Sequence, residues 1–432
     1  MSNQLKCMNE IRWGAIQPLT GGMYIGAEQA IGNKAEWIIS FPGFCDCKLD
    51  ESGNIIDANN EYNLVKYLEK HDKLPPYYTF NRKPFNTNYT IENIEIKDKD
   101  GNVVNPDYND IDIVVSVPVC SGLSMLTSNA SEDTKEEKNS NMIWLAKYTL
   151  NVIQPKIYVF ENAPTLLGPR GIGIRNTLEK MANDSGYSVV YYKTNTMLHD
   201  NCQHRIRTFT YFIKGYGVPI MNFEDMNVSV KEFFDRIPNN LTQQVTCDSI
   251  YGRTYNDSIF EFTMKEYGDN YKEKITGSLV HQIYKDKKYN ELLEYIKNDD
   301  SISEKERSAG IKYINHAIDK LSKGMNFYCN NYCVPPKDFM PSIMFRTIRS
   351  TLHPFENRLL NIRECMTLMG LPYDFEMYGE LKNYYPKIGQ NVPVRTVYWI
   401  IKEAIRILNN DCEFDRNTNV GVFNNISKKR EK

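Results

Sequence analysis

The stretch Asp112-Ile113-Val114-Val115-Ser116-Val117 is the strongest fold signal in this chain. An uninterrupted run of β-branched residues is typical of a central parallel strand that is buried on both faces. It leads directly into Pro118-Val119-Cys120-Ser121-Gly122. Ligands of open α/β sheets bind beyond the carboxyl ends of such strands. The sequence therefore predicts an α/β fold with Cys120 where chemistry can occur, although a cysteine there is, taken alone, more often a buried structural thiol.

The segments around this run alternate between short apolar stretches and longer amphipathic ones, as expected for a doubly wound α/β layer. Further strands are predicted at 36–41, 156–160, 188–194 and 207–213, and helices at 61–71, 142–152, 176–183 and 394–408. The polar residues 123–141 have no core face, so we expect them to form a mobile loop directly after a strand end.

The chain changes character after Lys214. Residues 220–270 have little periodicity, whereas residues 271–324 carry helical patterns with dense alternating charge. The charge runs at 285–288 and 304–307 are typical of a solvated helical face, an interpretation that we prefer to a specific contact surface. The predicted organisation is an α/β domain at 1–213, an inserted module at 214–345 and a return to the first domain at 346–432.

Composition excludes several classes of protein. The 432 residues include 52 basic and 54 acidic side chains, a formal charge of −2, and 41% are hydrophobic. Disordered tails, collagen-like fibres and polybasic nucleic-acid coats need more extreme compositions. Because the net charge is close to zero, a nucleic-acid partner would have to be held by a local basic surface.

The ten cysteines are scattered along the chain, unlike the dense framework of a small secreted domain. We see no signal peptide and no apolar run long enough to cross a bilayer, so we expect a cytoplasmic protein without a membrane partner. That cytoplasm would be bacterial, or a host's if a virus encodes the protein. The pairs Cys45/Cys47 and Cys329/Cys333 lack nearby histidines, so we prefer structural thiols to a zinc site and expect no metal.

Two more strand ends carry reactive groups. Glu161 follows the predicted strand 156–160, and Gln203-His204-Arg205-Ile206-Arg207 leads into the strand 207–213. Taken alone, Glu161 could cap a helix, and the basic run could be an ordinary strand edge. Their occurrence in one chain with Cys120, in this order, makes a shared site the better interpretation.

Together these motifs resemble those of the cytosine-5 DNA methyltransferase family. Pro118-Val119-Cys120 is similar to the family's cysteine motif, Glu161-Asn162-Ala163 to its Glu-Asn-Val motif, and Gln203 to Arg207 to its Gln-x-Arg-x-Arg motif. Three other segments look like the family's glycine-rich cofactor loop, the segment closing its recognition domain and its last motif: 20–30, 353–372 and 388–393. The resemblance extends from about residue 16 to 405, excluding the inserted module.

The resemblance implies a Rossmann-like S-adenosylmethionine-dependent methyltransferase sheet with an inserted smaller target-recognition domain. It also implies methyl transfer from S-adenosylmethionine to C5 of a cytosine flipped out of double-stranded DNA, by a monomer. Cys120 would attack C6, Glu161 would hydrogen-bond N3 and the exocyclic amine, and Arg207 would contact O2. Arg205 would orient the carboxylate and the cysteine loop, and the loop 123–141 would close over the base.

By the same resemblance, eight residues would bind the cofactor: Thr20, Gly21, Gly22, Met23, Pro118, Gln390, Asn391 and Val392. These cofactor-binding residues depart from the family's pattern more than the residues that would contact the cytosine base do. No carboxylate ends the strand 36–41 to bind the ribose hydroxyls, and Glu61 can replace it only if residues 42–58 form a hairpin insertion. In addition, Val119 stands where the family usually has proline before its cysteine.

These departures leave other functions open. The chain could use an altered cofactor, modify cytosine in RNA, or be a non-catalytic DNA-binding relative that keeps the fold. The abundance of Asn, Ile, Lys and Tyr favours a virus or an AT-rich genome as the source. A phage or restriction-modification role would fit that origin.

Overall fold

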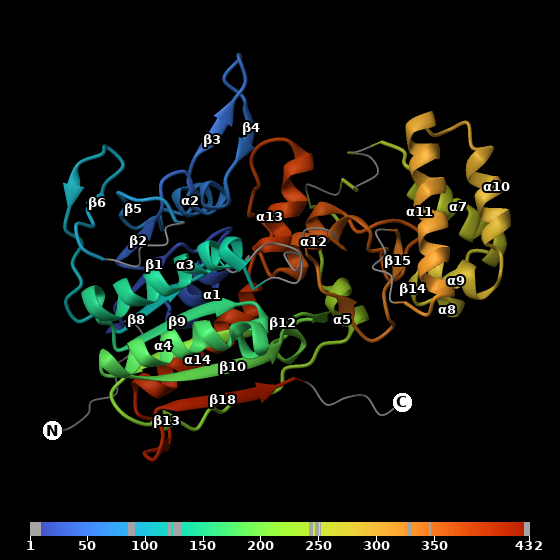
Figure 1. Ribbon diagram of the computed structural model, residues 1–432. Coiled ribbons are helices and arrows are strands. Elements are labelled where there is room, and N and C mark those ends of the chain that lie inside the picture. Colours follow the sequence, from blue (N-terminus) through green and yellow to red (C-terminus); the bar gives the residue numbers. More distant parts are fainter. Residues whose placement is uncertain are drawn as a thin grey trace.

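The computed structural model describes residues 10–84, 91–119, 122–123, 132–241, 245–246, 250, 252–325, 331–344 and 347–426. Its centre is a ten-stranded sheet in the order β18-β10-β12-β9-β8-β1-β2-β5-β6-β7 (Figure 1). From one edge to the other, the strands are β18 Val420–Asn425, β10 Tyr187–Asn195, β12 Ile206–Lys214, β9 Ile157–Asn162, β8 Ile113–Ser116, β1 Trp13–Ile16, β2 Trp37–Ser40, β5 Tyr77–Phe80, β6 Ile96–Lys97 and β7 Val103–Val104.

The middle of the sheet is parallel, as the apolar run at 112–117 predicts. Strands β5, β2, β1, β8 and β9 all run in one direction. Strand β12 is antiparallel to both β9 and β10, so β9, β10 and β18 have their carboxyl ends at the same edge. The predicted α/β class is confirmed, and this common edge is where a site is expected.

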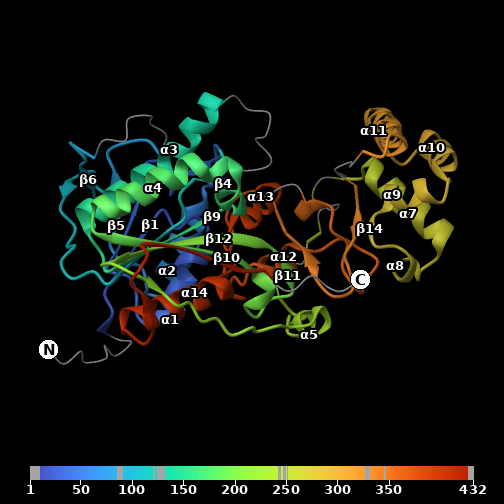
Figure 2. The same ribbon diagram turned by 60° about the horizontal axis from the view of Figure 1, so that its bottom comes forward.

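Helices cover both faces of the sheet, each over its own hydrophobic core (Figures 1 and 2). One face carries α1 Gly22–Ile31, α2 Asn60–Lys70 and α14 Val394–Leu408, and α1 packs along α14. The other face carries α3 Glu132–Tyr148, its π-helical continuation η3 Thr149–Ile153 and α4 Ile172–Asp184. The predicted helix 394–408 has the bounds of α14, which returns the chain's end to the first domain.

The expectation of a loop at 123–141 is wrong for its second half. Residues 132–141 form the first part of α3, and residues 124–131 lie outside the described part of the chain. The segment around 135–138 consists of lysines and glutamates, which are strong helix formers even where they have no core to face. Residues 139–141 are already buried, so the helix enters the core earlier than the apolar pattern indicates.

Between Pro219 and Met340 the chain leaves the sheet and forms a separate helical bundle (Figure 1). Its helices are α7 Tyr255–Tyr267, α8 Tyr271–Lys274, α9 Leu279–Lys285, α10 Tyr289–Lys297 and α11 Glu304–Ser322. The connecting helices are α5 Val230–Asp235, α12 Ile362–Leu368 and α13 Tyr384–Gln390, with 3-10 turns η4 Pro164–Leu167, η5 Pro169–Gly171, η6 Thr196–Leu198, η7 Thr347–Arg349 and η8 Leu381–Asn383.

The described residues also form four small two-stranded sheets, of which β3–β4 is a local hairpin and the other three join distant segments. The four sheets pair β3 Cys47–Leu49 with β4 Ile55–Ala58, β11 Gln203–His204 with β16 Met340–Pro341, β13 Val218–Pro219 with β17 Phe414–Asp415, and β14 Gly277–Ser278 with β15 Cys333–Val334. The β11–β16 pair attaches the end of the helical bundle to the segment that contains Arg205.

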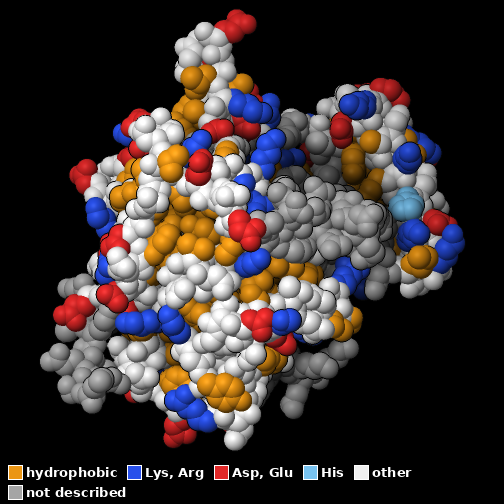
Figure 3. All heavy atoms as spheres, turned by 60° about the vertical axis from the view of Figure 1, so that its left-hand side comes forward, with side chains coloured by type: hydrophobic (Ala, Val, Ile, Leu, Met, Phe, Trp, Pro, Cys, Tyr) orange, Lys and Arg blue, Asp and Glu red, His pale blue; other side chains and the backbone are white. Residues whose placement is uncertain are grey.

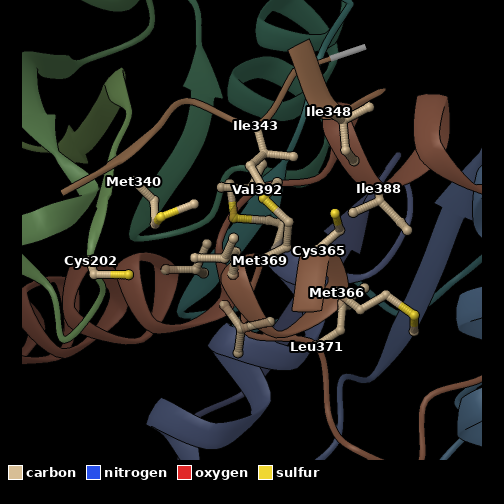
Figure 4. Packing of buried hydrophobic residues seen from close by; sticks show 14 of the residues in the cluster. Cys202, Met340, Ile343, Ile348, Cys365, Met366, Met369, Leu371, Ile388 and Val392 are labelled. Atoms are coloured by element: carbon tan, nitrogen blue, oxygen red, sulfur yellow. The ribbon is translucent and has the colours of Figure 1, made fainter. Parts of the chain in front are cut away.

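A sulfur-rich part of the core lies beside this junction (Figure 4). It includes Cys202, Met340, Cys365 and Met369, all fully buried, together with Val392. Methionine adapts its shape to irregular gaps, and here it fills the space where β11, β16, α12 and the segment after α13 meet. These elements are therefore fixed relative to one another.

Surface charge is mixed on the face of the molecule shown in Figure 3, where basic and acidic side chains are interspersed with hydrophobic ones. This agrees with the near-zero net charge of the sequence. Among the described residues, the model contains no helix with the length and hydropathy that a membrane span requires.

Candidate active site

The buried Glu161 forms an ion pair with the partly exposed Arg207 at the carboxyl edge of the sheet. Glu161 lies in β9, and Arg207 in the neighbouring β12, where Phe209 is the residue directly opposite Glu161. Residues two apart in a strand share a face, so Arg207 is the diagonal neighbour of Glu161. Its Nε lies 2.9 Å from Oε1 of the carboxylate. Burial raises the pKa of Glu161, and the charges of Arg207 and Arg205 oppose this rise.

Cys120 lies outside the described residues, but the residues on both sides of it are positioned. Strand β8, which leads to Cys120, pairs with β9 so that Ser116 lies opposite Phe160, next to Glu161. The backbone N–H of Val119 donates to Oδ1 of Asn141 over 2.8 Å. The carbonyl of Leu123 accepts from the Thr165 hydroxyl over 2.6 Å. The segment that contains Cys120 is thus attached at one end to α3 and at the other to η4.

Arg205 holds three separate segments together. Its side chain is 2% exposed, and its guanidinium donates to the carbonyls of Ile343, Gly389 and Asn391. The family resemblance gives Arg205 the role of orienting the carboxylate. Its charge does reach Glu161, but these bonds place it mainly between the end of the helical insertion and the last motif.

Gln203 complements Arg205. Its side-chain amide donates to the carbonyl of Leu368 over 3.0 Å and accepts from the N–H of Ile343 over 2.9 Å. The alternate residues of this motif therefore have different tasks: Gln203 and Arg205 join chain segments, and Arg207 reaches the carboxylate.

The glycine-rich loop packs directly on the last motif. Gly21 has φ +124°, a conformation that L side chains rarely adopt, and it precedes the first residue of α1. The N–H of Gly22 donates to Oδ1 of Asn391 over 2.9 Å. A Cβ at Gly22 would lie 1.7 Å from the carbonyl oxygen of Val392, so only glycine fits this contact. Gln390 accepts from the side chain of Asn60 at the start of α2.

Three more of the predicted cofactor residues lie around this contact. Thr20 is buried, and its hydroxyl donates to the carbonyl of Lys387 over 3.2 Å. Met23 is fully buried in the core beneath α1, so its side chain serves packing. Pro118, also buried, follows β8 at the same edge of the sheet.

Glu61 lies close to the end of β2. Residues 47–58 contain the β3–β4 hairpin that the Glu61 hypothesis requires, and α2 follows it. Glu61 is completely buried and accepts from the Tyr77 hydroxyl over 2.8 Å, whereas its other oxygen has no hydrogen-bond partner. Burial raises its pKa to about 7, and Tyr77, the Ser40 hydroxyl and the Leu19 backbone oppose the rise. Ser40 is the last residue of β2.

The paired cysteines show no ligand set. Within the described ranges, no three His, Cys, Asp or Glu side chains cluster closely enough to hold a metal ion. Cys45 is a free thiol whose pKa is raised to about 12 by burial and by the nearby Glu61. Cys329 lies outside the described residues.

A family model describing the C-5 cytosine-specific DNA methylases matches residues 58–406 of this sequence. The chain belongs to this family. Two curated proteins are similar to the chain over shorter segments. Type II methyltransferase M.HgiCII of Herpetosiphon aurantiacus is 27% identical over 141 residues, which cover 32% of this chain and 31% of that protein. A protein of Methanocaldococcus jannaschii described as type II methyltransferase M.MJ0563P is 39% identical over 64 residues, 15% of this chain and 20% of that protein.

The chain thus matches only about a fifth to a third of the length of these relatives. The comparison with solved structures is broader. A protein described as a DNA modification methyltransferase encoded within a prophage (E. coli) superposes with a TM-score of 0.52 at 14% identity, covering 93% of this chain and 100% of that one. At such low identity the likeness concerns the fold.

Two residues that position the candidate site were not predicted from the sequence. Asn141 lies in a segment that was expected to be a loop, and nothing in its neighbourhood indicates a buried acceptor for Val119. Thr165 follows the Glu161-Asn162-Ala163-Pro164 motif closely, so its proximity to the motif was the available signal. Both act on the segment containing Cys120 through single hydrogen bonds.

Proposed function

We propose that this protein is a DNA (cytosine-5)-methyltransferase, which transfers a methyl group from S-adenosylmethionine to C5 of a flipped-out cytosine. The observation that carries the proposal is the ion pair between the buried Glu161 and Arg207 at the carboxyl edge of the sheet. It lies beside the strand that leads to Cys120. Family membership and the printed names of the relatives support the same activity.

The pair suits the chemistry of a base whose C5 is a poor nucleophile. In the proposed reaction the Cys120 thiolate bonds to C6, and the electron pairs of the ring shift so that N3 takes a proton. Glu161 is the group proposed to supply that proton, because burial raises the pKa of its carboxyl group above the ordinary value. Arg207 would contact O2 of the ring, where it stabilises developing charge. Once C5 carries the methyl group, a water molecule would take the C5 proton, and the electron pair of that bond would form the C5=C6 double bond and expel the Cys120 thiolate. The N3 proton would return to Glu161.

The residues near Gly22 and Glu61 fit S-adenosylmethionine. Its ribose hydroxyls are donors, and the free oxygen of Glu61 is a buried acceptor without a partner. Thr20, Gly21 and Gly22 would form the adjacent wall, in which Thr20 is bonded to the carbonyl of Lys387 and Gly22 to the side chain of Asn391. When bound, S-adenosylmethionine supplies the methyl group that ends on C5. Because Asn391 already accepts from Gly22, it would act on the cofactor by fixing the loop.

The division into 1–213, 214–345 and 346–432 is part of the proposal, with the insertion as target-recognition domain. The helical bundle α7–α11 lies inside the insertion and apart from the sheet (Figure 1). Double-stranded DNA would bind between bundle and sheet. A monomeric, cytoplasmic protein stays the prediction of the sequence.

Covalent trapping on a duplex containing 5-fluorocytosine tests this function. Fluorine at C5 blocks the last step, so the wild type should give a stable protein–DNA adduct in the presence of S-adenosylmethionine, and Cys120→Ala should give none. An adduct that persists in Cys120→Ala would remove the nucleophile from the proposal. Parallel reactions with a tRNA substrate test whether the enzyme acts on RNA instead. Bisulfite sequencing of DNA from cells that express the protein determines the sequence in which cytosine is methylated.

A further inference from the structure

The helical bundle has two faces of different charge. Between α7 and α10 lies a hollow lined by five carboxylates, Glu266, Glu291, Glu294, Asp299 and Asp300, and by the single lysine Lys265. Four of these carboxylates already pair with a cation outside the lining: Glu266 with Lys288, Glu294 with Lys297, Asp299 with Arg253 and Asp300 with Arg307. The described lining therefore offers a phosphate backbone a single cation, Lys265. If the bundle contacts DNA, it therefore does so through another face.

The outward face of α11 has the opposite character. Lys305, Lys312 and His316 are exposed and fall on one side of the helix, because residues seven and eleven positions apart nearly repeat the helical turn. Between them lie the short neutral side chains of Ser308 and Ala309. We define the basic face of α11 by these five residues.

The acidic residues of α11 do not cancel this charge. Glu304 pairs with Arg307 over 2.9 Å, and Glu306 accepts from the backbone N–H of Tyr255. Asp319 pairs with Lys323 over 2.7 Å. Within the described residues, the structure records no ion pair for Lys305 or Lys312. These two lysines can therefore contact an external partner without first breaking a recorded ion pair.

The helix that carries the basic face lies on the side of the bundle nearer the sheet. In Figures 1 and 2 alike, α11 is nearer to the sheet domain than α10. A duplex that brings a base to Glu161 approaches the carboxyl edge of the sheet, on the side toward the bundle. It would pass α11 before it could reach α10.

We propose that the basic face of α11 binds the phosphate backbone of the DNA, with Lys305 and Lys312 each contacting one phosphate. The proposal rests on the proposed function and adds the surface through which the bundle holds its substrate. The two lysines are about 10 Å apart along the helix axis, and the short side chains between them let the backbone approach closely. Such contacts position the duplex and carry no base specificity.

Salt-dependent DNA binding tests the assignment. Affinity for a 30-base-pair duplex is measured by fluorescence anisotropy over a range of KCl concentrations, for the wild type and for Lys305→Gln/Lys312→Gln. Each phosphate contact contributes roughly 0.9 to the slope of log affinity against log salt, so the slope should become shallower by about 2. Extrapolated from about 1 M salt, this corresponds to roughly a 30-fold loss of affinity near 0.15 M.

A control variant removes two lysine charges near the acidic hollow, the same number as the α11 variant removes. Lys265 and Lys297 are exposed near the acidic hollow, so Lys265→Gln/Lys297→Gln should keep the wild-type slope. An unchanged slope in the α11 variant, or an equal change of slope in the control variant, would overturn the assignment of α11. If the wild type still forms the 5-fluorocytosine adduct, the proposed enzyme function stands in either case. A wild type that binds no duplex would overturn both.

Discussion

Replacement of Arg207 by methionine should destabilise the protein in a pH-dependent way. The substitution keeps an apolar stem of similar length but leaves Glu161 buried without its ion-pair partner. Breaking a buried pair by removing one member costs about 3–5 kcal/mol when the remaining group stays charged. A carboxyl group can avoid that cost by taking up a proton, so the loss depends on the pH at which it is measured.

The sign follows from the pKa of Glu161. Burial already raises this pKa in the wild type, and Arg207 opposes the rise, so Arg207→Met should raise it further. Stability from a group with a raised folded pKa is present at low pH and is lost as the pH rises through that pKa. The variant should therefore be about 3 kcal/mol less stable than the wild type at pH 8.5, and less than about 1 kcal/mol less stable at pH 5.

Urea unfolding of four proteins measures this effect: the wild type, Arg207→Met, Glu161→Gln and the double variant. Glutamine does not titrate, so adding Arg207→Met to Glu161→Gln should cost about the same at both pH values. A loss of equal size at pH 5 and pH 8.5 in the single variant would show that Arg207 acts by packing alone. The electrostatic interpretation of the pair would then be refuted.

Three other predictions concern the segments around the site. Asn141→Ala leaves the Val119 N–H without its acceptor, so adduct formation with 5-fluorocytosine duplex should slow on the order of tenfold; an unchanged rate would contradict a positioning role. Because burial sets the pKa of Glu61 to about 7, affinity for S-adenosylmethionine, measured by calorimetry, should rise about tenfold between pH 6 and 8 and stay flat in Glu61→Gln. Gly22→Ala forces a Cβ against the Val392 carbonyl and should lower the free energy of unfolding by roughly 1–3 kcal/mol, whereas Gly173→Ala, with open space around it, should not.

The elements that could be predicted from sequence are those whose pattern is set by burial alone. The run at 112–117 became β8, and the helix at 394–408 became α14. The start of α3 could not be predicted in this way, because charged residues give no core face from which to recognise a helix. The same limit hid Asn141, whose importance depends on a hydrogen bond to Val119, 22 positions earlier.

In the Gln203–Arg207 motif, tertiary structure gives different contacts to residues that the sequence pattern places together. Alternate residues of a continuous strand share a face, so the sequence suggests a single basic edge. The chain instead breaks at Arg205, between β11 and β12. The side chain of Arg205 is thereby released from the sheet face and reaches the carbonyls of Ile343, Gly389 and Asn391, whereas Arg207 stays beside Glu161.

Glu61 shows why a missing motif residue in the sequence need not be missing from the site. The hairpin of β3 and β4 separates β2 from α2 along the chain, yet it folds outward as a unit and leaves Glu61 near Ser40 at the end of β2. The carboxylate of Glu61 therefore lies near the end of β2, although Glu61 comes later in the sequence by the length of the hairpin. The cost is a carboxyl group buried deeply enough to raise its pKa to about 7. Binding of a ribose should then be coupled to loss of a proton, which is a property that a solvated carboxylate at the strand end would not have.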